Sequence, residues 1–356
     1  MTNPFKFGVL VDNEFFTDRT NELKEVQMSL NSTNHLILIS PRRFGKSSLV
    51  SKAVKASGRP CISLNMQNML SVEDLASKLL REVFRLYPME RVKHLMSHFR
   101  IIPTVSTNPV TNVIDVSFQP TINSMVLLED AMELVEKVST EKSKLIVVLD
   151  EFQEILNIRK GLDKQLRSIM QTQQHLNYIL LGSQESMMTE IFERKKSPFY
   201  HFGRLMRLAK IPYNDFKEYV STRLPISDQK QLNSIVEEIL SFTNLHPYYT
   251  QQLSSQVWEM VYYDHITDGV VGEAVSKIVR VHDLDFERLW LNFNRMDRSI
   301  MLSLSKGVNP LQNRQVATST SFSGIKRLMK SGYVIRVNDY EIEDPFFKEW
   351  IFKYCL

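Results

Sequence analysis

Short apolar runs alternate with longer segments of helical periodicity over the first 210 residues. The runs are too short for helices, whereas apolar residues recur every three or four positions in the segments between them. Strands that are apolar on both faces and separated by helices are typical of βαβ units. The pattern therefore predicts an α/β fold with a parallel sheet. The predicted strands are 36–39, 61–64, 145–149 and 178–181, and the predicted helices are 48–56, 72–87, 125–138 and 162–173.

Two parts of the chain depart from this alternation. Residues 101–120 contain three prolines, many Ser, Thr and Asn residues, and an alternating stretch at 113–118. This composition predicts an insertion at about 100–122, formed by a hairpin or by a long loop. After Pro212 the pattern becomes mainly helical, with predicted helices at 215–223, 228–243 and 247–263.

The C-terminal part has a pattern of its own. Helical segments at 295–305, 312–317 and 321–331 precede two short β-type segments, 333–336 and 340–342, which a turn region separates. Three helices closed by a small hairpin are typical of a winged helix. We therefore expect an α/β domain over 1–210, a helical lid domain over 211–290 and a winged-helix domain over 291–356.

Composition and charge exclude several classes of protein. With 43% hydrophobic and 24% charged residues, the chain resembles folded rather than disordered proteins. Its net charge of +4 is too small to indicate nucleic-acid binding by itself, so any basic surface must be local. The two cysteines, Cys61 and Cys355, have no zinc-type spacing. No run resembles a signal peptide or is long enough to cross a bilayer. We expect a cytoplasmic protein.

Residues 40–47, Ser-Pro-Arg-Arg-Phe-Gly-Lys-Ser, lie between a predicted strand and a predicted helix. They fit the phosphate-loop pattern G-x-x-x-x-G-K-[ST] except at its first position, where serine replaces glycine. In such a loop, backbone N–H groups surround the β-phosphate, the lysine bridges the β- and γ-phosphates, and the final hydroxyl ligates Mg²⁺. A Ser-Pro turn before a helix that carries a surface lysine is the alternative. The predicted nucleotide-binding residues are Ser40, Pro41, Arg42, Arg43, Phe44, Gly45, Lys46, Ser47 and Ser48, with Ser47 also a metal ligand.

An acidic pair follows the apolar strand at 145–149. A carboxylate at the carboxyl end of a parallel strand faces the nucleotide crevice, so Asp150 is the candidate partner of Mg²⁺. Glu151 is the candidate base that orients and deprotonates the attacking water. The alternative is that the pair caps the following helix. Taken with the phosphate loop, the pair predicts a Mg²⁺-dependent ATPase rather than a passive nucleotide binder.

Two further residues are candidates for contact with the γ-phosphate. Ser183 follows the strand at 178–181 and could contact the phosphate or the attacking water, although a plain Gly-Ser turn explains it equally well. Arg204 could neutralise charge that develops on the γ-phosphate, although an isolated arginine is more often a surface residue. The predicted catalytic residues are Lys46, Glu151, Ser183 and Arg204.

Together these segments resemble the archaeal-type ATPase family, a branch of the STAND group within the AAA-like P-loop NTPases. The Asp-Glu-Phe-Gln run at 150–153 and the Phe-x-x-Arg-x-x-Glu-Leu segment at 16–23 discriminate more than the phosphate loop, which many families share. Ser40 departs from the family's usual glycine. The matching segments are 16–23, 41–49, 149–155, 166–171, 181–183, 197–204 and 246–249.

The resemblance implies roles that spacing does not show. It implies that Phe16 and Arg19 lie against the adenine, that Arg204 senses phosphate or acts as a finger-type arginine, and that His246 and Pro247 begin a lid helix near the phosphates. It also implies a C-terminal winged helix. Without the resemblance, Arg19 would be interpreted as part of a surface pair on a helix, and His246-Pro247 as an ordinary helix start.

The winged helix leaves the choice of partner open. In the predicted recognition helix, Lys326, Arg327 and Lys330 face outward, so they could bind DNA phosphates with little base selectivity. We favour a regulatory lid or a protein-binding surface.

The function that these observations favour is a nucleotide-dependent switch that binds ATP and Mg²⁺ and hydrolyses ATP slowly. A protein partner or self-association in the ATP state is expected. The alternative is a DNA-binding or scaffold protein whose P-loop fold no longer uses nucleotide. A small-molecule kinase ranks last, because the sequence shows no acceptor pocket.

Overall fold

The computed structural model describes residues 2–10, 15–16, 19–97, 99–100, 103–107, 114–117, 123–265, 268–312 and 318–356. The chain forms two compact units. The first, which we call the α/β unit, comprises Thr20–Ser40 and Leu49–Leu208. The second, which we call the helical unit, comprises Met1–Arg19, Pro41–Ser48 and Ala209–Leu356. The phosphate-loop segment is thus grouped with the helical unit, although its two ends continue into the α/β unit.

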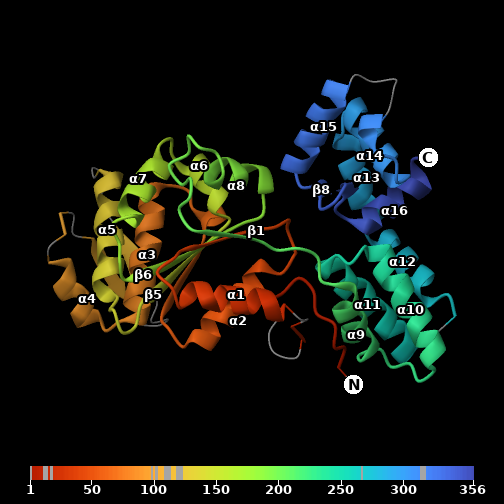
Figure 1. Cartoon of the computed structure of the whole chain (residues 1–356), viewed down its shortest axis with the longest axis horizontal. Coiled ribbons are helices and arrows are strands. Elements are labelled where there is room, and N and C mark those ends of the chain that lie inside the picture. Colours follow the sequence, from red (N-terminus) through yellow and green to blue (C-terminus); the bar gives the residue numbers. More distant parts are fainter. Residues whose placement is uncertain are drawn as a thin grey trace. The chain divides into compact units, whose positions relative to one another are not determined.

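A five-stranded parallel sheet forms the centre of the α/β unit (Figure 1), which confirms the predicted fold class. The strand order is β2-β5-β6-β1-β7, and every neighbouring pair is parallel. Four of these strands were predicted, and β7 was not. Their bounds are β1 Leu36–Ile39, β2 Cys61–Asn65, β5 Leu145–Asp150, β6 Leu176–Gly182 and β7 Arg204–Arg207.

Helices cover the sheet because its strands are apolar on both faces. On one face, alternate strand residues such as Val147, Leu149 and Tyr178 pack into a large core with α3 and α5. Helix α3 packs one apolar stripe against this core. The Ser71 hydroxyl caps the helix by accepting from the Asp74 N–H (3.2 Å). The helices are α1 Thr20–Leu30, α2 Lys46–Ser57, α3 Val72–Leu86, α4 Met89–Met96, α5 Ser124–Val138, α6 Ile155–Ile158, α7 Leu162–Met170 and α8 Glu185–Phe192, with 3₁₀ turns η2 Met66–Asn68 and η3 Phe152–Glu154.

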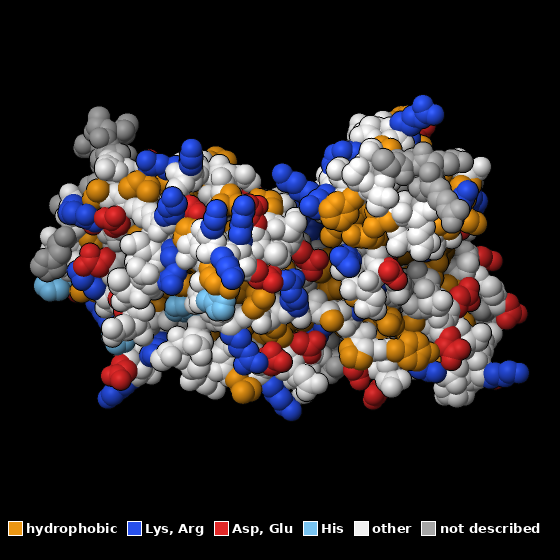
Figure 2. Space-filling model, turned by 45° about the horizontal axis from the view of Figure 1, so that its top comes forward, with side chains coloured by type: hydrophobic (Ala, Val, Ile, Leu, Met, Phe, Trp, Pro, Cys, Tyr) orange, Lys and Arg blue, Asp and Glu red, His pale blue; other side chains and the backbone are white. Residues whose placement is uncertain are grey.

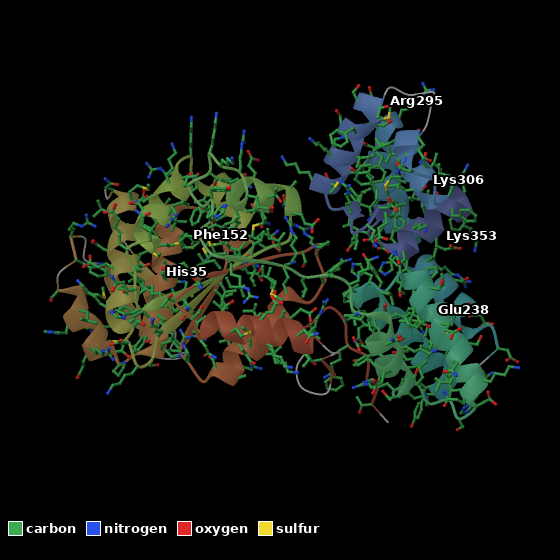
Figure 3. The ribbon with its side chains drawn as sticks, viewed as in Figure 1. His35, Phe152, Glu238, Arg295, Lys306 and Lys353 are labelled. Atoms are coloured by element: carbon green, nitrogen blue, oxygen red, sulfur yellow. The ribbon has the colours of Figure 1, made fainter. Side chains whose placement is uncertain are left out.

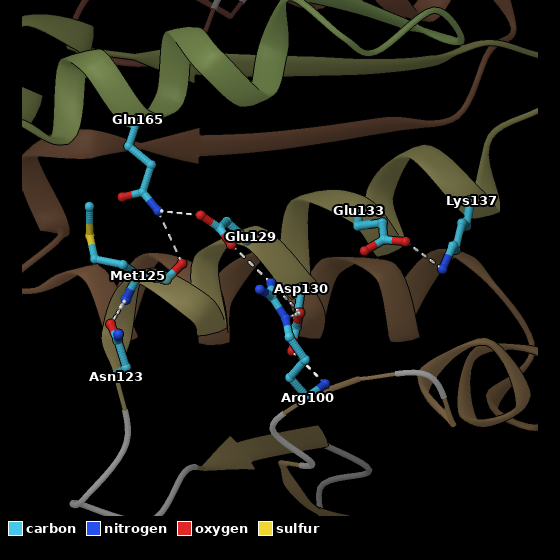
Figure 4. Close-up of polar contacts among 8 residues, drawn as sticks. All are labelled: Arg100, Asn123, Met125, Glu129, Asp130, Glu133, Lys137 and Gln165. Carbon is cyan, nitrogen blue, oxygen red and sulfur yellow. Dashed lines mark hydrogen bonds and ion pairs between the residues drawn. The ribbon is translucent and has the colours of Figure 1, made fainter.

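The segment between α4 and α5 contains an antiparallel strand pair, β3 Thr104–Thr107 and β4 Ile114–Ser117. This pairing is the hairpin alternative of the predicted insertion. Arg100 fixes the start of the segment to α5 through Asp130 (2.9 Å) and Glu129 (3.0 Å), as Figure 4 shows. The remaining parts of the insertion, 101–102, 108–113 and 118–122, lie outside the described residues.

Aromatic rings pack beneath the end of β5. Phe152, labelled in Figure 3, is fully buried, and its ring centroid lies 5.2 Å from that of Phe199. The cluster extends through Phe202 to His35, whose ring stacks on Phe202 at 4.6 Å. Burial lowers the pKa of His35 to about 4, and the charge of Arg167 adds to this effect. The chain that follows β5 is therefore anchored in a rigid apolar core.

Positive charge is concentrated on the α/β unit. Residues 159–207 contain nine Lys or Arg residues against four Asp or Glu residues, an excess of five where the whole chain has an excess of four. Lys and Arg side chains are numerous on the face of this unit drawn in Figure 2. The run 194–196, which follows α8, is exposed, and Arg194 pairs with Glu190 (2.7 Å). The basic surface is thus local, as the bulk charge indicated.

The helical unit surrounds a second core that includes Trp258, Tyr249 and Phe346. Its C-terminal part contains α14, α15 and a β8–β9 hairpin where helices and a hairpin were predicted. Of the predicted helix 312–317, Gln312 lies in the 3₁₀ turn η4, and 313–317 lie outside the described residues. The elements are α9 Tyr213–Ser221, α10 Gln229–Thr243, α11 Pro247–Tyr263, α12 Val270–Val281, α13 Asp283–Asn292, α14 Arg295–Ser305, η4 Pro310–Gln312, α15 Thr318–Lys330, β8 Val334–Arg336, β9 Tyr340–Ile342 and α16 Pro345–Tyr354.

Among the described residues, no helix has both the length and the apolar character needed to span a membrane.

Candidate functional site

The acidic pair lies at the carboxyl-terminal edge of the parallel sheet. Asp150 is the last residue of β5, and Ser183 directly follows β6, the neighbouring strand. The Ser183 hydroxyl donates to the Glu151 carboxylate at 2.6 Å. The structure thus brings together two of the predicted catalytic residues, and it gives Ser183 a contact with the candidate base.

A third residue, which the sequence analysis did not single out as a candidate, holds the same carboxylate. Gln153 is fully buried, and its side-chain amide donates to the same oxygen of Glu151 at 2.5 Å. Glu151 itself adopts a left-handed backbone conformation (φ 53°), which is rare for a residue with a side chain and is often found at functional sites. The only sequence signal for Gln153 was its place in the Asp-Glu-Phe-Gln run. Two donors and a fixed backbone therefore set the direction of the carboxylate.

The phosphate-loop segment connects β1 to α2. Ser40 remains at the sheet, where its N–H donates to the Gly182 carbonyl at the end of β6 (3.3 Å). Beyond it, Arg43 (φ 61°) and Gly45 (φ 87°) both have positive φ, and α2 begins at Lys46. Alternating backbone handedness and a helix N-terminus turn successive N–H groups toward one point, which is the geometry of an anion-binding loop.

Lys46 lies inside this loop. Its side chain is buried, and its ammonium donates to the Pro41 carbonyl at 2.9 Å. A surface lysine after a Ser-Pro turn, the alternative interpretation of the motif, would be exposed instead. The burial of Lys46 and the loop geometry both favour the phosphate-loop interpretation.

Arg19 and His246 both contact Phe44 of the loop. The Arg19 guanidinium is buried and donates to the Phe44 carbonyl at 3.3 Å. The His246 ring, just before α11, packs edge-on against the Phe44 ring at 4.9 Å. Pro247 is the first residue of α11, and Phe16 is partly buried. Arg19, His246 and Pro247, whose roles were implied only by the resemblance, thus lie in or beside elements that touch the loop.

The ring of His246 is buried, and neither of its nitrogens has a hydrogen-bond partner among the described residues. A carboxylate oxygen of Glu343 lies 3.5 Å from Nε2, which is long for a hydrogen bond. Burial lowers the pKa of His246, and this effect outweighs the opposing influence of Glu343. The neutral ring beside Phe44 is therefore available to a polar ligand atom.

A chain of hydrogen bonds joins the phosphate loop to the C-terminal hairpin. The Arg43 guanidinium donates to the Tyr249 hydroxyl (2.8 Å), which donates to the Glu343 carboxylate (2.7 Å) just after β9. The guanidinium also lies over the Tyr248 ring, 4.6 Å from its centroid. Tyr249 is 1% exposed, so the middle of this connection is shielded from water, whereas Arg43 at its end is exposed. The connection was not predicted, because its residues are far apart in the sequence.

Asp344, next to Glu343, caps α16 by accepting from the Phe346 N–H at 2.8 Å. Burial raises the pKa of Asp344 to about 6, and the charge of Glu343 adds to the shift. A carboxyl whose pKa is higher in the folded state contributes stability that is complete below its unfolded pKa, near 4, and is lost as the pH rises through 6. Ionisation of Asp344 should therefore cost the folded chain on the order of 3 kcal/mol.

The variant Asp344→Asn tests this pH dependence. Asparagine caps helices as well as aspartate does but does not ionise. We expect the wild-type free energy of unfolding to fall by about 2–3 kcal/mol relative to the variant between about pH 4 and pH 7. Urea titrations at both pH values measure it. Because the pKa of His246 is lowered in the folded state, protonation of this residue destabilises both proteins below about pH 6.5. The effect is the same in both, so it cancels in the difference between their free energies of unfolding. Parallel pH profiles would contradict the prediction.

Arg204 lies at the amino-terminal ends of the parallel strands, opposite the acidic pair. It is the first residue of β7 and pairs in register with Leu36, the first residue of β1, whereas Asp150 and Ser183 lie at the carboxyl ends of their strands. Its side chain forms an exposed ion pair with Glu25 (3.2 Å). The structure does not bring Arg204 to the acidic pair. Its role as a phosphate-contacting cation stays a prediction that this placement does not support.

The donor set fits magnesium better than a transition metal. Mg²⁺ usually takes one or two protein oxygens and fills its remaining positions with water and substrate phosphates. The side chains of Ser47 and Asp150 carry oxygen donors of the kind that Mg²⁺ prefers. No cluster of three His, Cys, Asp or Glu residues that could hold a metal occurs within the described part of the chain.

The sequence also matches a known family. A family model for an ATPase domain found predominantly in Archaea matches residues 16–253. The chain belongs to this family. The matched range includes the phosphate loop, the acidic pair, Ser183 and His246, and it confirms the resemblance to archaeal-type ATPases. The chain is accordingly a P-loop NTPase of an ATP-binding family. No curated protein matches the sequence significantly.

Solved structures show the same fold over nearly the whole chain. The Walker-type ATPase PABY2304 of Pyrococcus abyssi is 16% identical, with 98% of this chain and 99% of that chain covered and a TM-score of 0.66. The ORC2 protein of Aeropyrum pernix, in its ADPNP-ADP complexes, is 15% identical, with 98% of each chain covered and a TM-score of 0.57. The ORC1 protein of Aeropyrum pernix, in complex with DNA, is 13% identical, with 95% and 92% covered and a TM-score of 0.50.

Proposed function

We propose that this chain is a Mg²⁺-dependent ATPase of the STAND type that hydrolyses ATP slowly and acts as a nucleotide-dependent switch. The observation that carries the proposal is the phosphate loop, with the buried side chain of Lys46 inside it and left-handed turns at Arg43 and Gly45. The backbone N–H groups of Gly45, Lys46 and Ser47 bind the β-phosphate. Arg19 and Phe16 lie toward the adenine, and His246 accepts or donates a hydrogen bond near the phosphates.

The acidic pair supplies the hydrolytic step. Glu151, oriented by Ser183 and Gln153, accepts the proton of the attacking water. Ser47 and Asp150 would hold Mg²⁺, which would neutralise negative charge on the phosphates. Slow turnover fits a switch, because the ATP state must persist long enough to be sensed.

The connection from Arg43 through Tyr249 to Glu343 gives the switch a physical route. Arg43 belongs to the phosphate loop, and Glu343 follows the last strand of the hairpin. When the γ-phosphate draws Arg43 or its neighbours, the Tyr249 hydroxyl must exchange partners, which changes how β9 and α16 are held. This hydrogen-bonded segment is the element whose two arrangements the nucleotide biases.

Hydrogen exchange of β9 and the first turn of α16 tests this route. We expect their amide exchange rates to differ between the ATP and ADP states of the Glu151→Gln variant. Adding Tyr249→Phe should remove that difference and change ATP affinity by no more than about threefold, since the phenol makes no contact that ATP requires. Tyr248→Phe, in the neighbouring position, is the matched control and should preserve the difference. Equal exchange in the two nucleotide states would contradict the switch.

Contact of the C-terminal region with DNA is a weaker proposal. Of the three cations predicted to face outward on α15, Arg327 is committed to a double contact with the buried carboxylate of Asp297 (2.5 and 3.2 Å). Lys326 lies over the Phe322 ring. A protein contact in the ATP state therefore remains our preferred partner class, and the cellular location remains the expected cytoplasm.

A further inference from the structure

Helix α13 presents an uncovered apolar stripe. Leu284 and Leu291 are seven residues apart, so they lie on the same side of the helix, and they are 66% and 63% exposed. Val281, at the end of α12, is 74% exposed. Single exposed leucines are ordinary, but large apolar side chains aligned along one helix mark a surface that another surface covers.

Exposed charged side chains accompany this stripe, and acidic ones predominate on the helix. Asp285 and Glu287 are exposed on α13, and Arg288, which is also exposed, lies 3.6 Å from Asp285. Asp283, by contrast, is occupied, because it accepts from the Trp350 indole N–H at 2.6 Å. The surface that covers α13 should therefore be apolar at its centre and positively charged at its rim.

A cavity of that character lies on the next helix, α14. Its volume is about 750 Å³, within the range of ligand-binding clefts. Phe293, Leu302 and Val308 form its apolar part, while Arg295, Arg298 and Lys306 supply three cations, and no Asp or Glu lines it. None of these cations forms an ion pair with an acidic residue in the parts of the chain that the structure describes. Figure 3 labels Arg295 and Lys306, which mark the two ends of α14.

The stripe and the cavity adjoin each other. The Arg298 guanidinium, in the cavity wall, donates to the carbonyls of Trp290 (3.2 Å) and Leu291 (3.1 Å), at the end of α13. When two complementary patches lie side by side on one surface, each patch of one copy can bind the other patch of a second copy. The two equal contacts are related by a two-fold axis, as in an isologous dimer.

We propose that two copies of this chain associate through these patches, with the α13 stripe of each copy seated in the α14 cavity of the other. The leucines enter the apolar part of the cavity, and Asp285 and Glu287 meet Arg295 and Lys306. A nucleic acid would pair with the cations but would leave Leu284 and Leu291 uncovered, so the second copy fits better. The contact lies outside the nucleotide-binding residues and does not depend on ATP hydrolysis.

Charge reversal tests the proposal, because it predicts both a loss of dimerisation in each variant and its recovery when the two variants are mixed. One variant carries Asp285→Lys and Glu287→Lys, and the other carries Arg295→Glu and Lys306→Glu. All four side chains are exposed, so folding should survive, which thermal melts and ATP binding check. Sedimentation equilibrium should show a wild-type dimer, and each variant alone should dissociate at least about tenfold more readily, because like charges then face each other at both contacts.

A mixture of the two variants gives the decisive measurement. In the mixed pair, basic α13 meets an acidic cavity and acidic α13 meets a basic cavity, so a heterodimer of wild-type affinity should form. A wild-type protein that stays monomeric, variants that dimerise like wild type, or a mixture that stays monomeric would each overturn the proposal. So would a monomer whose cavity variant loses binding to duplex DNA, which would assign the cavity to nucleic acid.

Discussion

Replacing Lys46 with alanine should raise the Kd for ATP by at least about 100-fold. The Lys46 ammonium is buried in the loop, where it donates to the Pro41 carbonyl, so its charge is held at the point where the loop N–H groups converge. In a buried setting of low dielectric, a charge-assisted contact to phosphate is worth several times its value in water. Titration with a fluorescent ATP analogue measures the loss.

A matched control for this variant lies on the same helix. Lys55→Ala removes an exposed lysine from the last turn of α2 and should leave the Kd unchanged within about twofold. An alanine variant at Lys46 that binds ATP as tightly as the Lys55 variant would remove the basis for the phosphate loop. The nucleotide-independent alternative, a scaffold that keeps only the fold, predicts that outcome.

Replacing Glu151 with glutamine should leave ATP affinity within about threefold and lower kcat by about 100- to 10,000-fold. The amide keeps the size of the side chain and can still accept from Ser183 and Gln153, but it cannot take a proton from water. Because only the catalytic step changes, the variant should accumulate as the ATP complex. Single-turnover assays with labelled ATP separate binding from hydrolysis.

Two further variants distinguish the loss of the catalytic base from the loss of a residue that positions it. Glu154→Gln, in the 3₁₀ turn that follows Glu151, removes a carboxylate that accepts from the Asn157 amide (2.8 Å), and this variant should hydrolyse ATP normally. Ser183→Ala removes one of the two donors to Glu151, so we expect a loss of about tenfold in kcat with KM little changed. A Glu151→Gln variant with wild-type kcat would show that another group is the base.

The sequence predicted those parts of the fold that are locally encoded. The strands β1 and β6 are buried along their whole length, and β5 is buried up to Asp150, so their apolar runs are clear in the sequence. The edge strand β7 reads Arg-Leu-Met-Arg and is buried only at Met206, so nothing in its pattern indicates a strand. The sequence therefore did not show that Arg204 begins a strand. Helix α4 was missed because it is short and begins directly after Pro88.

The same distinction applies to the candidate site. Lys46, Ser47, Asp150 and Glu151 belong to contiguous motifs whose chemistry can be inferred from neighbouring residues. The contact of Tyr249 with Glu343 joins residues 94 positions apart, and no periodicity indicates such an approach. Local sequence patterns therefore identified the candidate catalytic residues, whereas the contacts that orient and connect them became visible only in the folded chain.

The central claim is that backbone N–H groups of the phosphate loop bind ATP, and amide NMR chemical shifts measure this most directly. On titration with a non-hydrolysable ATP analogue, the amides of Gly45, Lys46 and Ser47 should shift furthest and saturate at the Kd found by fluorescence. If the analogue binds while these three amides stay unmoved and amides elsewhere shift, the nucleotide occupies another site and the account is wrong.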